Sequence, residues 1–193
     1  FFKKGKAKDG HVRMSKVREG FAWILCVGFV LIISGIDYLK FFVDEKFWTG
    51  LYLVPILLLA NVILGINTNL NVWYKVSDKT VYGIYITFVG LLFTVVGNVA
   101  LIPVLGILGA AITTLVAYFA MFVASVLWGN KHYPVPYNWG KIGAFLAFAC
   151  LVVFILHYTQ WPSGPLKVLG GVLYLGVMLF WERNGLLKFA TRK

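Results

Sequence analysis

The feature that most constrains this chain is a run of 50 residues, from Val81 to Asn130, without one charged side chain. A helix needs roughly 20 apolar residues to cross a hydrocarbon core about 30 Å thick. The run is therefore too long for one crossing and suits two. Because proline ends a helix and glycine permits a turn, the segment Pro103-Val104-Leu105-Gly106 predicts a tight hairpin between helices over about 81–102 and 106–128.

Further apolar runs divide the rest of the chain and predict four more transmembrane helices, over about 21–39, 47–74, 142–158 and 166–181. The composition agrees, since 60% of the 193 residues are hydrophobic and 13% are charged, against roughly 45–50% and 25% in soluble domains. We therefore expect an all-α polytopic membrane protein. It would have a cytoplasmic loop at 1–20, a six-helix transmembrane domain at 21–182 and a cytoplasmic tail at 183–193.

The basic residues indicate the orientation of these helices. The net charge is +11, but the basic residues lie between the apolar runs instead of forming one face, and no nucleic-acid-binding motif is present. With the N-terminus taken as cytoplasmic, 15 of the 18 Lys and Arg residues fall inside and 3 outside, as the positive-inside rule predicts. All seven tryptophans lie near a predicted helix end or in a connection, at the level of the headgroups. We expect membrane lipid as a partner, no nucleic acid, and both ends on the cytoplasmic side.

The predicted helix over 47–74 is rich in asparagine and contains Pro55, which is either a hinge or a tolerated kink. Asn67, Asn71 and Tyr74 share one face through spacings of four and three. Amides in hydrocarbon cost free energy unless they are paired or face water. These three residues are candidates for lining a cavity, where amides would meet sugar hydroxyls. The alternative is hydrogen bonding between helices.

Small residues share one face of the predicted helix over 106–128, at steps of four and three. They are Gly106, Ala110, Thr113, Ala117, Ala120 and Ala124. In lipid, small residues favour association because they let helix backbones approach closely. The face is either a static packing surface or one that slides against a neighbour during a conformational cycle, and both require a partner helix.

Groups typical of catalysis or metal binding are not clustered. No charge lies deep in a predicted helix, the three histidines fall in connections or at a helix end, and Cys26 and Cys150 read as small hydrophobes in apolar runs. We therefore expect no catalytic residue, metal or cofactor. A polytopic membrane glycosyltransferase or acyltransferase is the alternative from another class, with Asp37, Glu45 and His157 as its candidate residues.

Two segments carry a family resemblance. They are Asn98 with Leu101-Ile102-Pro103, and Gly106-Ile107-Leu108-Gly109-Ala110-Ala111, and both follow an Asn-rich helix and the turn from Tyr74 to Thr80. They resemble the C-terminal half of the bacterial polysaccharide flippases, which belong to the multidrug/oligosaccharidyl-lipid/polysaccharide exporter superfamily. The opening Phe1-Phe2-Lys3-Lys4 is similar to the cytoplasmic loop before the last six helices of such proteins. Because Phe1 stands first rather than Met, we expect the chain to be a piece of a longer one.

The resemblance implies a two-lobed exporter in the bacterial inner membrane, with this chain as most of one lobe and an N-terminal lobe of the same protein as the other. It implies a lipid-linked oligosaccharide substrate, used for lipopolysaccharide or another surface polysaccharide and moved by alternating access. The charged residues that meet the substrate's pyrophosphate would lie in the absent N-terminal lobe or at cytoplasmic helix ends, such as Arg18, Lys75 and Lys79. The hairpin and packing residues would be Pro103, Gly106, Gly109, Ala110, Thr113 and Ala117. A multidrug exporter of the same fold, or a purely structural membrane subunit, is an alternative.

Overall fold

The structure, a computed structural model, describes residues 19–39, 41, 44–132, 139–158 and 164–190. Within these ranges every regular element is a helix and no strand forms. The all-α class predicted from the apolar runs is confirmed. The predicted cytoplasmic loop at 1–20, apart from Glu19 and Gly20, lies outside the described residues.

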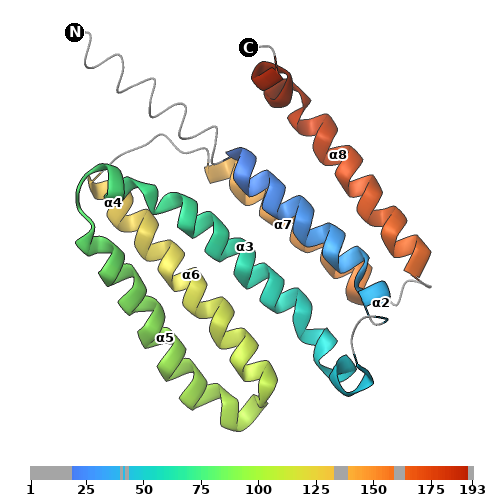
Figure 1. The fold of residues 1–193 in the computed structure, drawn as a ribbon, viewed down its shortest axis with the longest axis horizontal. Helices are drawn as coiled ribbons and strands as arrows, with labels where there is room; N and C mark the ends of the chain where they lie inside the picture. Colours follow the sequence, from blue (N-terminus) through green and yellow to red (C-terminus); the bar gives the residue numbers. More distant parts are fainter. Residues whose placement is uncertain (1–18, 40, 42–43, 133–138, 159–163, 191–193) are drawn as a thin grey trace. The chain divides into compact units, whose positions relative to one another are not determined.

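The helices follow the apolar runs of the sequence (Figure 1). Their bounds are Glu19–Ser34, α2 (Ile36–Leu39), η2 (Glu45–Leu53), α3 (Val54–Leu70), α4 (Val72–Val76), α5 (Val81–Leu105), α6 (Ile107–His132), α7 (Trp139–Tyr158) and α8 (Gly164–Ala190).

Three helical stretches in the described part of the chain are long and apolar enough to cross a membrane: Gly50–Lys75, Val81–Leu105 and Ile107–His132. The other apolar helices there are shorter, at Glu19–Ser34, Gly140–Leu156 and Pro165–Trp181. Six crossings and a two-lobed fold therefore stay predictions.

The predicted helix over 47–74 is not one regular helix. It begins as the 3-10 helix η2, becomes α-helical at Val54, and breaks at Asn71 before α4. Pro55 lies in the first turn of α3, where the N–H that proline lacks would have had no partner in the helix. Neither a hinge nor a kink within an α-helix is therefore needed to accommodate this proline.

The turn between α5 and α6 falls at Gly106, but Pro103 does not end the first helix as the sequence predicted. α5 continues through Pro103 to Leu105, because a proline this close to the end removes one hydrogen bond while neighbouring bonds persist. Gly106 has φ +58° and ψ −134°, a backbone conformation that essentially only glycine adopts. Its N–H donates to the Ile102 carbonyl at 2.8 Å and closes the last turn.

Two helices extend beyond their predicted ends. α6 reaches His132 instead of residue 128, and α8 reaches Ala190 instead of residue 181. The predictions ended each helix where charge resumes, but a helix that leaves an apolar layer can continue into water. Residues 183–190 of the predicted cytoplasmic tail are thus helical.

The chain divides into two compact units, and residues Phe1–Leu25 with Tyr52–Ala144 form the first. In this unit α6 contacts α5 along one side and α3 along another, and Figure 1 shows α6 between them. Trp73, Ile66, Leu70 and Ile86 are among the fully buried side chains. An ion pair joins Glu19 on the first helix to Lys141 on α7, with the Lys141 Nζ to Glu19 Oε2 distance at 3.2 Å.

The second unit contains Cys26–Leu51 and Phe145–Lys193. The α7 and α8 helices meet through aromatic rings, with Phe148 and Tyr174 stacked at 5.2 Å between ring centroids. Lys167 on α8 pairs with Asp37 on α2, and the Nζ to Oδ2 distance is 2.9 Å. Lys167 is the single basic residue of the predicted helix over 166–181, and the Asp37 carboxylate neutralises its charge. Its long side chain can also reach a membrane surface.

Candidate functional site

The polar face of α3 and α4 lies in the first unit, against α6. Ser125 of α6 donates a hydrogen bond from its hydroxyl to Asn71 Oδ1 at 2.7 Å. Asn71 is half-buried and sits in the break between α3 and α4. The face was predicted either to line a cavity or to make hydrogen bonds between helices, and at Asn71 the structure shows the hydrogen bond.

Asn67, one turn earlier on the same face, has no such bond. Its side chain is 1% exposed, and neither its amide nitrogen nor its amide oxygen has a hydrogen-bond partner among the described residues. A buried amide without a partner costs about 1–3 kcal/mol. Asn67 is enclosed by packed helices in this structure, and its role as a cavity-lining residue stays a prediction.

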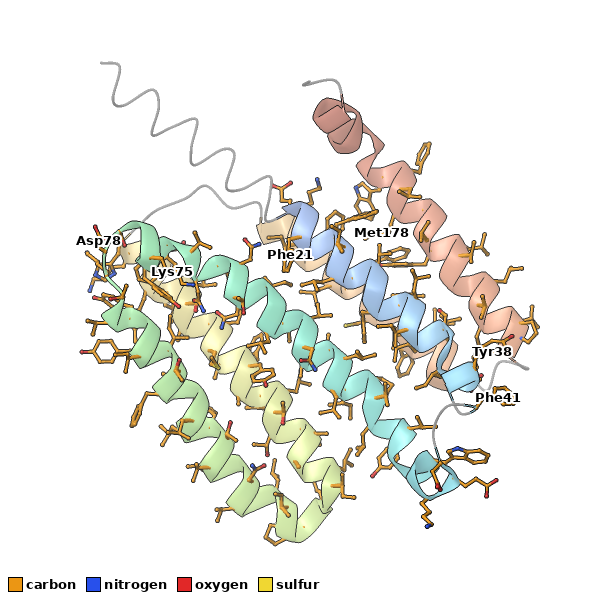
Figure 2. All side chains as sticks on the ribbon, viewed as in Figure 1. Phe21, Tyr38, Phe41, Lys75, Asp78 and Met178 are labelled. Atoms are coloured by element: carbon orange, nitrogen blue, oxygen red, sulfur yellow. The ribbon has the colours of Figure 1, made fainter. Side chains whose placement is uncertain are left out.

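Tyr74 and Lys75 line an open groove of about 560 Å³ beside the start of α5. The Tyr74 ring lies over Gly83, where an added Cβ would sit 3.1 Å from the tyrosine Cζ. Lys75 and Lys79 are exposed at the turn before α5, at the end of the unit where Figure 2 labels Lys75 and Asp78. Arg18, the third predicted phosphate contact, lies outside the described residues.

The small residues of α6 pack as a row with a period of four rather than along the predicted face. The buried members of the row are Gly109, Thr113, Ala117, Ser125 and Gly129. Among the other predicted hairpin and packing residues, Ala110 is half-buried, while Pro103 and Gly106 are exposed. Of the predicted hairpin and packing residues, Gly109, Thr113 and Ala117 are therefore buried in this row, although Gly109 does not belong to the face predicted from alternating steps of four and three.

At Gly109 the backbones of α5 and α6 approach each other closely. A Cβ there would lie 2.5 Å from the carbonyl oxygen of Leu101 and 2.7 Å from its carbonyl carbon. Both obstructing atoms belong to backbone, which cannot rotate away as a side chain can. Only glycine at position 109 therefore lets the two helices meet this closely.

α5 carries a matching row of glycines that the sequence reasoning missed. Gly83, Gly90 and Gly97 recur every seven residues, and each faces a larger side chain: Tyr74, Met121 and Thr113 respectively. The seven-residue spacing is the signal that could have found this row, since it returns to the same helix face every two turns.

The sequence reasoning also missed a cluster of aromatic residues at the end of the unit that holds the turn before α5. The Tyr82 hydroxyl lies 2.9 Å from His132 Nε2, and His132 Nδ1 lies 3.0 Å from the Trp128 carbonyl oxygen. Because a carbonyl can only accept, Nδ1 carries a proton, and in neutral His132 the Nε2 accepts from Tyr82. Trp73 stacks on the histidine ring at an interplanar angle of 10°. The residues lie 50 positions apart, so only the meeting of α5 and α6 brings them together.

Of the three residues considered for an enzyme, the structure describes the side chains of two. Asp37 pairs with Lys167, Glu45 is exposed at the start of η2, and the side chain of His157 lies outside the described side chains. Among the described residues no group of three His, Cys, Asp or Glu side chains is placed to hold a metal ion.

In comparisons with known proteins, no family model, curated protein or solved structure matches the chain.

Proposed function

We propose that this chain is part of a membrane transporter that moves a lipid-linked oligosaccharide across the bacterial inner membrane, for surface polysaccharide synthesis. The chain would supply most of one lobe, and an N-terminal lobe of the same protein would complete the transport path. Substrate would cross by alternating access, in which two lobes rock about a central site. No catalytic group, metal or cofactor takes part in this mechanism.

The observation that carries the proposal is the unpartnered amide of Asn67. A polar group buried in apolar helices without a hydrogen bond destabilises the fold, so its presence calls for an explanation. Amide oxygens and nitrogens are well suited to sugar hydroxyls, because they both accept and donate. Asn71 lies one turn away on the same face and already bonds one hydroxyl, that of Ser125.

The hairpin between α5 and α6 supports the same interpretation. The residues that resemble the flippases, from Asn98 to Ala111, form the end of α5, the turn at Gly106 and the start of α6. Two apolar helices held together through glycines can move as one body, which a rocking lobe requires. The exposed lysines at positions 75 and 79, with Arg18, are the candidates for the anionic pyrophosphate of the substrate.

The decisive experiment is deletion of the gene that encodes the chain. We expect lipid-linked repeat units to accumulate on the cytoplasmic side of the inner membrane, measured by accessibility to an added glycosidase in inverted vesicles. Unchanged surface glycans and unchanged lipid-linked intermediates would contradict the proposal. Accumulation of a drug instead of a glycan lipid would favour a multidrug exporter of the same fold.

A pair of variants tests the role of Asn67. We expect Asn67→Leu to raise the free energy of unfolding by about 1–3 kcal/mol, because it removes an unpartnered buried amide, and to lower transport. Asn61→Leu is the matched control, since the exposed Asn61 amide donates to the Leu57 carbonyl of its own helix at 2.8 Å. The control should leave transport unchanged. Unchanged transport in Asn67→Leu would remove this residue from the substrate path.

Replacement of Asp37, Glu45 and His157 together tests the enzyme alternative. We expect transport to persist, measured as delivery of repeat units to the outer surface. Loss of all activity in a folded triple variant would favour a membrane glycosyltransferase or acyltransferase.

A further inference from the structure

The groove beside α5 has one charged end and a long apolar floor. Lys75 lines one end together with Thr80, and Ile84, Phe88 and Leu91 follow along α5. Ile84 is 69% exposed and Phe88 is 62% exposed, so this floor is not covered by the unit to which it belongs.

The dimensions of the groove fit one leaflet of a bilayer. Thr80 and Leu91 are eleven residues apart, which corresponds to about 16 Å along a helix. One leaflet occupies about 15 Å of a hydrocarbon core about 30 Å thick. A single acyl chain that starts at the headgroup level would therefore run the length of the floor.

The charged end is suited to an anion. Lys75 is exposed and has no ion-pair partner among the described residues, and Lys79 adds a second exposed cation at the same turn. The Tyr74 hydroxyl also has no hydrogen-bond partner in the described part of the chain, and it lies where its ring crosses Gly83. An ammonium group and a phenol next to each other can both donate to a phosphate oxygen.

From these observations we infer that the groove binds one anionic glycerophospholipid, with its phosphate at Lys75 and Tyr74 and an acyl chain along Ile84, Phe88 and Leu91. A second copy of this chain is a poor occupant, because a chain with 18 basic and 7 acidic residues offers few carboxylates to Lys75. The inference assigns Lys75 to a membrane lipid, whereas the proposed function counts it, with Lys79 and Arg18, among the candidates for the substrate's pyrophosphate; displacement by a polyprenyl phosphate distinguishes the two. It does not rest on the proposed transport function.

The test is native mass spectrometry of the purified chain with phosphatidylglycerol or phosphatidylcholine, both with 16-carbon chains. We expect one phosphatidylglycerol to stay bound when other lipids are stripped. Lys75→Ala should reduce its retention about 5-fold, the contribution of one lysine near an anionic lipid surface. Lys131→Ala is the matched control, an exposed lysine at the same end of the unit that does not line the groove, and it should retain the lipid.

A second variant tests the apolar floor independently of the charge. Thr87 lines the groove between Ile84 and Phe88, so Thr87→Trp should fill it and reduce the retention of both lipids. Equal losses in Lys75→Ala and Lys131→Ala would overturn the inference, because binding would then follow net charge alone.

Two other outcomes would overturn the choice of occupant. Displacement of phosphatidylglycerol by an equimolar polyprenyl phosphate would assign the groove to a transported lipid. A disulfide-linked dimer of Phe88→Cys that retains no lipid would assign it to a second copy of the chain. Unchanged glycans and lipid-linked intermediates in the gene deletion experiment would contradict the transport proposal but leave the lipid site standing, since the two measurements are separate.

Discussion

α5 and α6 are two apolar helices of almost equal length, yet they bury very different surfaces within the same unit. α5 buries Ile86 and Gly90, whereas α6 buries Gly109, Ala111, Thr113, Ala117, Ser125 and Gly129. α6 lies between α3 and α5, while α5 meets its neighbours along one side and leaves bulky residues exposed on the other. Small residues, rather than hydropathy, therefore distinguish a helix that faces protein from one that has a face free for lipid.

The largest expected effect tests whether the exposed face of α5 meets hydrocarbon. Val96 is 59% exposed near the middle of α5, and Val96→Asp should raise the apparent free energy of membrane insertion by about 2.5–3.5 kcal/mol. The measurement is the inserted fraction of the α5 segment in a translocation assay. Val104→Asp is the control at the helix end, where the carboxylate can reach the interface and the cost should be much smaller. Equal insertion costs for Val96→Asp and Val104→Asp would mean that the exposed face of α5 does not meet hydrocarbon.

The next effect concerns the contact between the two helices. Gly109→Ala should lower the free energy of unfolding by about 2–3 kcal/mol, because its methyl group would meet the Leu101 backbone. Unfolding in mixed micelles with a denaturing detergent would measure it. Gly143→Ala on α7 is the control, since a Cβ there meets nothing within 4 Å, and it should be neutral or stabilising. A neutral Gly109→Ala would mean that α5 and α6 pack less closely than the structure shows.

A smaller effect tests the polar contact that α6 makes with the break between α3 and α4. In a double-mutant cycle of Ser125→Ala and Asn71→Ala, we expect a coupling energy of about 0.6 kcal/mol and at most about 1.7 kcal/mol. A cycle of Ser125→Ala with Thr68→Ala should give no coupling, because the Thr68 hydroxyl bonds the Leu64 carbonyl of its own helix. Coupling in both cycles would indicate a general loosening of α3 rather than a specific bond.

An effect of similar size lies where the start of α5 meets the end of α6. Tyr82→Phe removes the hydroxyl 2.9 Å from His132 and should cost about 0.5–1.5 kcal/mol of unfolding free energy. Tryptophan fluorescence should report the change, because Trp73 stacks on His132 and Trp128 neighbours Tyr82. Tyr85→Phe is the control, since the Tyr85 hydroxyl makes no hydrogen bond within the described part of the chain. An unchanged spectrum in Tyr82→Phe would contradict the prediction and show that ring packing holds this cluster without the hydrogen bond.

The positions of the helices could be predicted from the sequence because charge and apolar runs mark where a chain enters and leaves an apolar layer. Charge was a poorer guide to where each helix stops, as α6 and α8 show by continuing past it. Pro103 was also misread, since a single missing hydrogen bond near a helix end does not break the helix. The turn itself required Gly106, whose positive φ no bulky residue adopts at low cost.

The candidate site was harder to predict, because its contacts join residues that are far apart in the chain. Ser125 bonds Asn71 across 54 positions, and Tyr82 meets His132 across 50. The spacing of Asn67 and Asn71 showed that they share a face, but it could not show that one amide has a partner and the other has none.

By itself, the sequence determined that this chain is helical and that three of its described helices are long and apolar enough to cross a membrane, because composition and periodicity act locally along the chain. Only the tertiary structure decided which face of each helix meets another helix. That choice depends on steric fit between two surfaces, such as Gly109 against the Leu101 backbone, and such a fit exists only once the helices are in contact.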